Sequence, residues 1–385
     1  MYLRRLLFPV WPEWAVKVVL PPICMAFLTG ICGNGSKTIV SVASFVGAGP
    51  KATKVGTSVA TVLNLQIWHT LRIPLTVEGR HTQGIVTWDY DWHPPASFAE
   101  ADSFAAEQKS QEPQIVLWGR AWRYGSGIVA EPFLLIRYEV GSCAFGEDLW
   151  SVARASGEAF SVGVPDRQIE FAPITIHLDS LSGLPSGLKL YGSPTSQQSV
   201  GVVGDYFTAL EQGPDAVKVR IPNGTQGWIH LPLGSREHSN VVDFTEGIIK
   251  IFRKDWDGAS APLIRVGNDI RAPTNVRSNA FLYLAIAAAH SGGDALQWVS
   301  KAYELTPFSK TTLQYLCMAK LDELQKAGED RELRSARLDE LRRIVLAGSP
   351  LYAPDDPWFL RLKKFLDEQE PQAKRQMQLD NSTVN

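Results

Sequence analysis

The chain has 385 residues and a formal net charge of −2, and its 38 Lys and Arg residues are mixed along the sequence with 40 Asp and Glu residues. This balance leaves no basic field that would attract nucleic acid, so we expect no nucleic-acid partner. A hydrophobic fraction of 45% and a charged fraction of 20% exclude a disordered or collagen-like chain. The length exceeds that of one ordinary hydrophobic core and predicts roughly two to four domains.

The N-terminus carries a targeting pattern. Arg4, Arg5 and Lys17 precede an uncharged stretch of 15 residues over 18–32. A membrane-spanning helix needs about 20 apolar residues, so this stretch fits the apolar region of a secretory signal better. We predict a signal or membrane-anchor segment over 1–35, which indicates the cell envelope, either periplasmic or membrane-anchored. The alternative is a cytoplasmic protein in which the stretch packs inside the fold.

Residues 36–140 alternate between strand and helix patterns in the order β-α-β-α-β-β, which predicts an α/β sandwich. Strand patterns cover 38–45, 84–90, 114–124 and 128–138, and amphipathic helix patterns cover 57–71 and 96–109. Gly125-Ser126-Gly127 joins the last two strands and supplies the positive φ that a hairpin turn needs. Alternation along 114–124 places Trp118, Trp122 and Tyr124 on one face.

The strand before this hairpin carries a short motif, Val116-Leu-Trp-Gly-Arg120. Together with the element order, this motif resembles the N-terminal α/β domain of curli-secretion-lipoprotein (CsgG-like), FlgO-like and TolB N-terminal proteins. The resemblance implies relatives that help to assemble or regulate outer-membrane and cell-wall machinery. It does not extend to a secretion pore, because the sequence has no long amphipathic hairpins. Residues 141–184 then form a connecting segment, and the strand character of 168–177 leaves open that it extends the first domain.

Residues 185–233 hold the strongest pattern of the chain. Short strand-like runs alternate with turn residues every few positions, which predicts a small β-barrel. Gly192-Ser-Pro194 follows the first run, and Asn223-Gly-Thr-Gln-Gly-Trp-Ile229 forms the last hairpin. These two ordered motifs resemble the bacterial SH3 family (SH3b), although Tyr191 stands where that family usually has arginine.

Three aromatic residues of this module are the candidate ligand-binding residues: Tyr191, Tyr206 and Trp228. Flat apolar rings on a small barrel could hold a peptide or a cell-wall stem. The alternative for Trp228 is a structural role, because small barrels usually bury one such ring.

Residues 240–368 show helical patterns with short connections that contain Gly or Pro, as expected for an array of helix hairpins. The spacing of Ala295, Val299, Ala302 and Pro307 is similar to the second helix of a tetratricopeptide repeat, and the region resembles a degenerate pair of such repeats. In a concave repeat groove the candidate partner-binding residues are Trp298, Tyr303 and Tyr315, with core packing as the alternative. Residues 369–385 are predicted to be a polar tail.

Patterns that carry catalysis are missing. The sequence has no phosphate-binding loop, no nucleophile elbow and no His-Glu-x-x-His helix, and its seven histidines never reach metal-ligand spacing. We therefore expect no catalytic residue, no metal and no cofactor. The alternative is a hydrolase that uses Asp89, Asp91 and His93, which cluster at the end of a predicted strand.

The four cysteines are widely spaced, and none forms a Cys-x-x-Cys pair. They are Cys24, Cys32, Cys143 and Cys317. This spacing argues against a zinc site and against a disulfide framework, so we expect buried free thiols.

These expectations combine into a multidomain α+β chain with an N-terminal α/β sandwich, a central SH3-like β-barrel and a C-terminal helical repeat region. We expect it to act as a non-enzymatic envelope adaptor, in which the barrel holds cell wall or a peptide and the helical region holds a protein partner. The alternative of the same class is a cytoplasmic protein-interaction scaffold.

Overall fold

The computed structural model shows a mixed α/β protein with open sheets and an array of helices. It describes residues 38–43, 45–48, 55–56, 59–60, 63, 67, 94–107, 113–125, 127–137, 149–153, 159–177, 188–203, 208–212, 216–221, 223–230, 239–328 and 330–369. Several predictions fall outside these residues: the segment 1–35, the strand 84–90, the cluster Asp89, Asp91 and His93, the ring of Tyr206, and the tail beyond 369. Among the helices that are described, none combines the length and apolar character needed to cross a bilayer.

The largest sheet has six strands. They are β1 (Ile39–Val42), β2 (Val46–Ala48), β3 (Gln114–Tyr124), β4 (Gly127–Arg137), β7 (Gln168–Glu170) and β8 (Ile174–His177). β1 and β2 both pair in parallel with β3, and β7 and β8 both pair in antiparallel fashion with β4. β3 and β4 are paired along their whole length, which confirms the predicted hairpin, and Gly125 in its turn has φ +57°.

The two faces of this sheet are covered differently. Helix α5 (Phe98–Glu107) packs on one face, where the rings of Phe98 and Phe133 lie 5.4 and 4.7 Å from that of Trp118. The opposite face belongs to a larger core that contains Leu117 and the helical residues Val59, Leu63 and Ile67. The helical character and burial of these three residues agree with the helix predicted over 57–71.

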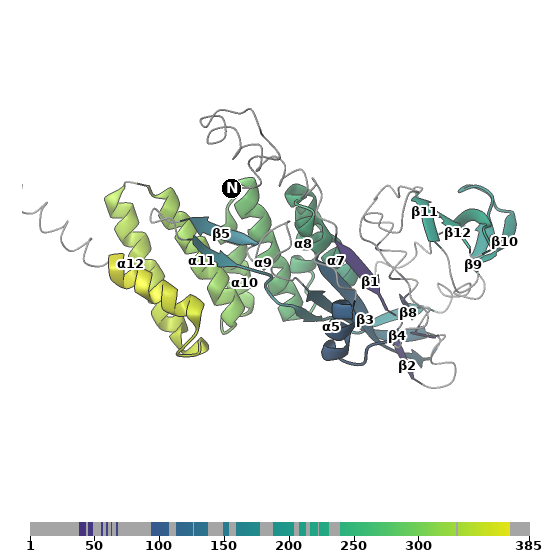
Figure 1. The fold of residues 1–385 in the computed structure, drawn as a ribbon, viewed down its shortest axis with the longest axis horizontal. Helices are drawn as coiled ribbons and strands as arrows, with labels where there is room; N and C mark the ends of the chain where they lie inside the picture. The colour runs from purple at the N-terminus through teal and green to yellow at the C-terminus, as the bar shows by residue number, and fades with distance from the viewer. Residues whose placement is uncertain are drawn as a thin grey trace, which may run out of the picture.

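The C-terminal region is an array of consecutive helices. It comprises α7 (Ser239–Phe252), α8 (Trp256–Asn268), α9 (Thr274–Ser291), α10 (Ala295–Leu305), α11 (Lys310–Lys326), α12 (Arg331–Gly348), the short 3₁₀ helix η2 (Ser349–Leu351) and a last helix over 357–369. Each helix from α7 to α12 packs on the next (Figure 1). Side-chain caps fix several starts: Asp294 accepts from the N–H groups of Leu296 and Gln297, and Ser309 accepts from that of Thr312.

A closed network of charges joins α11 to α12. The Lys320 ammonium is buried and lies 3.0 Å from Glu323 and 2.9 Å from Glu340, and Arg337 contacts both carboxylates. The hydrogen bond from Lys320 lowers the pKa of Glu340 below its ordinary value. Each buried charge thus has opposite partners, which is the condition under which burial of ions is tolerated.

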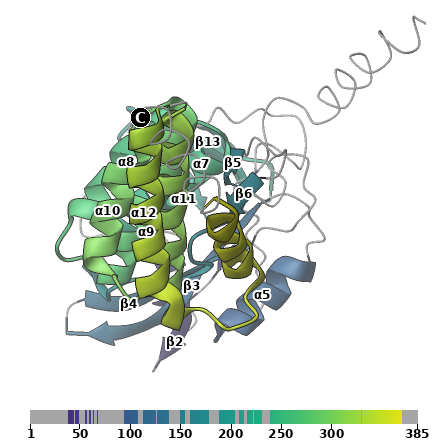
Figure 2. The ribbon, with the colours of Figure 1, turned by 90° about the vertical axis from the view of Figure 1, so that its left-hand side faces the viewer.

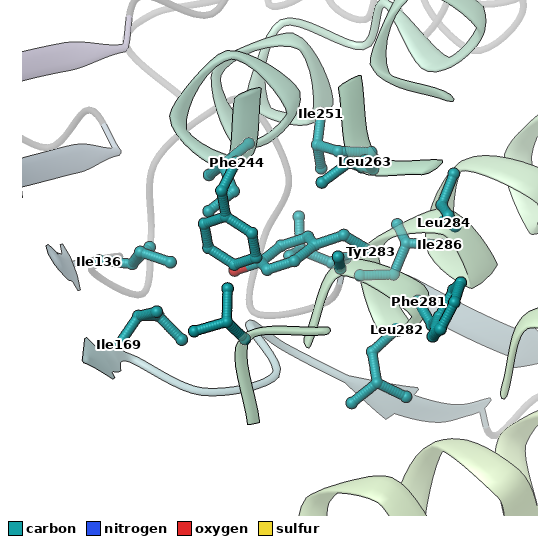
Figure 3. Packing of buried hydrophobic residues seen from close by; sticks show 14 of the residues in the cluster. Ile136, Ile169, Phe244, Ile251, Leu263, Phe281, Leu282, Tyr283, Leu284 and Ile286 are labelled. Atoms are coloured by element: carbon teal, nitrogen blue, oxygen red, sulfur yellow. The ribbon is translucent and has the colours of Figure 1, made fainter. Parts of the chain in front are cut away.

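Segment 141–184, predicted to be a connection or an extension of the first domain, contributes four of the described strands, and β7 and β8 within 168–177 agree with the second alternative. β7 and β8 complete the large sheet, and β5 (Trp150–Ala153) pairs only with β6 (Ala159–Val162) among the described strands. This β5–β6 hairpin packs against α9 and α11, as Figure 2 shows from the end of the helical array. Figure 3 shows the continuation of this core, where Tyr283 and Phe244 meet Ile136 and Ile169 of the sheet. Sheet, hairpin and helices therefore share one hydrophobic core.

Cys317 lies in this core on α11, and burial raises the pKa of its thiol to about 12. A thiol with this pKa is almost wholly protonated near neutral pH and is a weak nucleophile. In a chain with Cys24, Cys32 and Cys143 replaced by serine, we expect no reaction with a thiol reagent at pH 8 and one reacting group in denaturant. Rapid reaction of the native chain would show that the helix opens locally.

The second sheet has five antiparallel strands. They are β9 (Leu188–Tyr191), β10 (Ser199–Val203), β11 (Thr208–Gln212), β12 (Ala216–Arg220) and β13 (Gln226–His230), in the spatial order β10-β9-β13-β12-β11. In Figure 1 it lies at one end of the molecule, on the side away from α12. Five short strands therefore lie within the stretch for which the sequence predicts short strands.

Candidate binding face

The last hairpin of the five-stranded sheet is set by its turn. Gly224 has φ +87°, and its N–H donates to the Ile221 carbonyl at 2.9 Å. The Asn223 side chain accepts from the Thr225 N–H at 3.0 Å. An Asn-Gly turn suits this geometry because glycine adopts positive φ without strain. The turn fixes the register of β12 and β13, which pairs Lys218 with Trp228.

A glycine lets β13 approach β9 closely. A Cβ at Gly227 would lie 2.4 Å from the Leu190 side chain and 2.8 Å from the Tyr191 carbonyl oxygen, so any other residue would push the strands apart. Leu190, Gly227 and Ile229 are buried on the inner face of the sheet. Because side chains alternate along a strand, Tyr191 and Trp228 point to the other face.

One row of positions crosses all five strands of this other face. In order across the sheet, the register places Ser199, Tyr191, Trp228, Lys218 and Glu211 opposite one another. Directly opposite residues have Cβ atoms about 5 Å apart, so the side chains of Tyr191 and Trp228 leave the sheet next to each other. Both are half-buried and keep part of their surface open. We call this surface, with its centre at Tyr191 and Trp228, the aromatic row.

The turn over 192–198 bounds one end of the aromatic row. His230 lies two residues beyond Trp228, and its ring meets that of Tyr191 edge-on at 4.4 Å. Its Nε2 lies 3.4 Å from the Ser196 carbonyl oxygen, which connects the turn to the sheet. His230 therefore contacts both the Tyr191 ring and the backbone of the turn over 192–198.

The charges described around the aromatic row are mostly positive. Lys189 is exposed two residues before Tyr191, and Arg220 is exposed two residues after Lys218. Neither Lys189 nor Arg220 makes an ion pair with a residue in the described part of the chain. A ligand that carries carboxylates would find unneutralised cations on both sides of the row.

The predicted ligand-binding residues are thus brought together in part. Tyr191 and Trp228 are direct neighbours, whereas Tyr206 lies outside the described residues. Trp228 is half-buried and lies opposite Tyr191, beside the inner core formed by Ile229. His230 was not anticipated from the sequence. The only signal that could have located it is its spacing of two from Trp228 on one strand.

The predicted partner-binding residues do not form one groove. Trp298 stacks on Phe281 at 6.1 Å under the ammonium of Lys301, and Tyr303 packs half-buried against the core. Tyr315 is buried, and its hydroxyl donates to the Gly163 carbonyl just after the β5–β6 hairpin. Burial raises the pKa of Tyr315 well above its usual range, so the phenol keeps the proton that it donates. An external partner could reach this ring only if the hairpin moved.

The inner face of the helical array is instead occupied by the chain itself. His290 Nε2 donates to the Leu149 carbonyl at 2.6 Å, and Trp358 Nε1 donates to the Ser161 carbonyl at 3.0 Å. Next to the hairpin, Asn279 donates to the Asp166 carboxylate at 2.7 Å and accepts from the Asp166 N–H at 3.1 Å. The polar contacts of the helices with segment 149–166 are therefore made mostly to its backbone, and its apolar side chains, Trp150 and Phe160 among them, pack in the shared core.

No grouping of three His, Cys, Asp or Glu side chains suited to a metal ion occurs within the ranges that the structure describes. The geometry that these ranges do contain, two cross-strand aromatic residues on a partly open face with flanking cations, is suited to non-covalent binding of a flat or extended group. No protein-family model, curated protein or solved structure matches the chain.

Proposed function

We propose that this protein is a non-enzymatic adaptor whose aromatic row binds an extended peptide chain, either free or as the stem peptide of cell wall. The observation that carries the proposal is the direct pairing of Tyr191 with Trp228 on a partly open face. Half-buried aromatic rings held by a rigid sheet offer a large contact area at a small cost in side-chain entropy.

The SH3-like identity of the five-stranded sheet is part of this proposal. It is supported by five short antiparallel strands, by Gly192-Ser-Pro194 after the first of them, and by the Asn223–Ile229 hairpin at the end. We likewise propose a CsgG-like N-terminal sheet and degenerate tetratricopeptide-like helices. Because the β5–β6 hairpin covers α9 and α11, a protein partner of the helical array would contact the remaining helices.

The cell envelope is the proposed location. It is supported by the basic start and the uncharged stretch over 18–32. Cell fractionation and sequencing of the mature N-terminus test it. An intact Met1 in the soluble cytosolic fraction would favour the cytoplasmic scaffold instead.

Replacing Trp228 by alanine in the full chain is expected to weaken ligand binding by about 2 kcal/mol, or roughly thirtyfold, because the substitution removes the centre of the aromatic row. The measurement is retention on beads that carry peptidoglycan attached covalently through its glycan strands, in parallel with the same beads after an amidase has removed the stem peptides. Retention only by the intact material identifies the stem as ligand. If neither material retains the protein but soluble peptides bind to it, the ligand is a free peptide.

The matched control is Tyr124→Ala, because Tyr124 is an aromatic residue with 74% of its surface exposed at the tip of the β3–β4 hairpin. This variant should bind as the unmodified chain does. If peptidoglycan retains the Trp228 and Tyr124 variants equally, and circular dichroism is unchanged in both, the aromatic row is not the binding site.

A further inference from the structure

Strand β10 is an edge with unusually little protection. Among the described strands it pairs only with β9. Its sequence, Ser-Val-Gly-Val-Val, contains no charged residue and no proline, and Val200 and Val202 expose 57% and 54% of their surface. Sheet edges normally carry charges, prolines or a covering segment, because their unpaired N–H and C=O groups accept a further strand. A bulge between Ser199 and Gly201 disrupts the pairing of the first half of β10 with β9. Val202, in the second half, pairs in regular register with Lys189.

A strand added to this edge would extend the aromatic row. Ser199 on β10 lies opposite Tyr191, so a residue paired with Ser199 becomes the sixth position in the row. Its side chain would emerge on the same face as Tyr191 and Trp228, about 10 Å from Tyr191 across the small Ser199, so that a long side chain could contact the first ring. Main-chain hydrogen bonds to β10 and side-chain contacts to the row can therefore come from one extended segment.

The positive charge of Lys189, beside β10, indicates which kind of strand can bind to this edge. Lys189 lies opposite Val202, is exposed, and makes no ion pair with a described residue. A second copy of this chain, joined edge to edge through β10, would add another Lys189 to the same face and leave both ammonium groups without a counter-ion, so it gains nothing from this charge. A strand that carries carboxylates would neutralise Lys189 instead.

We infer that the ligand of the aromatic row is an acidic, extended peptide segment that adds to β10 as a sixth strand. This inference rests on the proposed function and specifies the partner that the site accepts.

The test uses the full chain and three synthetic peptides with a common Thr-Val framework. The first carries Glu at alternate positions, the second carries Lys at those positions, and the third is the Glu peptide with alternate backbone nitrogens methylated. Dissociation constants are measured by fluorescence anisotropy of labelled peptides. The variants are Lys189→Glu and, as the charge-matched control, Lys363→Glu on the exposed side of the last helix.

We expect the Glu peptide to bind about threefold more tightly than the Lys peptide, because one exposed ion pair contributes at most about 1 kcal/mol. Methylation should weaken binding by at least about tenfold, because it removes several main-chain hydrogen bonds. Lys189→Glu should reverse the preference between the two peptides, and Lys363→Glu should leave it unchanged.

The outcomes separate this inference from the proposed function. Equal binding of the methylated and unmethylated Glu peptides would overturn strand addition while leaving the aromatic row as a binding face. Binding of peptidoglycan that depends on Trp228, without binding of any peptide, would do the same. A concentration-dependent dimer that blocks peptide binding would overturn the inference by placing a second copy on β10.

Discussion

Replacing Gly119 by alanine is expected to destabilise the chain by about 3 kcal/mol or more, the largest effect that we predict for a single added carbon. Gly119 lies in the middle of β3, opposite Pro132. A Cβ at this position would lie 2.2 Å from the Glu131 carbonyl oxygen and 2.4 Å from the Phe45 ring. The oxygen belongs to the backbone of β4, so the clash can be relieved only by separating β3 from β4 or by moving the chain between β1 and β2.

The measurement for Gly119→Ala is the midpoint of urea unfolding, followed by circular dichroism. Gly201→Ala is the control within a strand, because the new Cβ would lie 3.8 Å from Leu190, which is ordinary contact. This control should cost less than about 1 kcal/mol. Similar midpoints for the two variants would mean that the packing of Phe45 against β3 is not as close as the structure has it.

Local patterns predicted the elements whose formation depends on neighbouring residues. The β3–β4 hairpin follows from two alternating runs around Gly125, and it forms with complete pairing. Alternation also predicted that Trp118 and Tyr124 share a face. It could not predict that Trp118 is buried and Tyr124 exposed. A helix of 10 residues spans about 15 Å and a strand of 11 residues about 37 Å, so α5 can cover less than half of β3.

The candidate site could be predicted only as a set of residues. Tyr191 and Trp228 were recognised from turn motifs, but their adjacency depends on pairing between strands that are far apart in sequence. That pairing requires the close approach at Gly227, which has no signature beyond a glycine beside a tryptophan. Lys189 was not singled out, because its role depends on which strand forms the edge of the sheet.

The largest departure concerns Tyr315 and the segment before β7. The helix that carries Tyr315 was predicted, with a place in an open groove or in the core as the two alternatives for the ring, and the ring is buried. The β5–β6 hairpin occupies the place of the groove, and much of its polar contact with the helices is made through backbone carbonyls such as those of Leu149 and Gly163. Backbone groups are identical for every residue type, so these contacts leave no trace in the sequence.

Replacing Asn279 by leucine is expected to cost about 3 kcal/mol and to loosen the contact between the helical array and the segment before β7. Asn279 is buried on α9 and makes hydrogen bonds to both the carboxylate and the N–H of Asp166, with a further bond to the Asn275 carbonyl at 2.8 Å. Leucine has the same branching as asparagine but is larger and makes none of these bonds. Within the described part of the chain, the Asp166 carboxylate would then keep only the Thr311 hydroxyl, at 3.2 Å, as its partner.

Hydrogen exchange separates loss of this contact from general unfolding. In Asn279→Leu we expect faster exchange over 149–166 than over the β3–β4 hairpin, because the hairpin keeps its own pairing. The graded control is Thr311→Val, which removes one hydrogen bond to the same carboxylate and should cost about 1 kcal/mol. If exchange accelerates equally in both regions, the sheet and the helices open as a single cooperative unit. If it accelerates in neither, Asp166 contributes little to holding segment 149–166 on the helices, and the apolar contacts of Trp150 and Phe160 hold it instead.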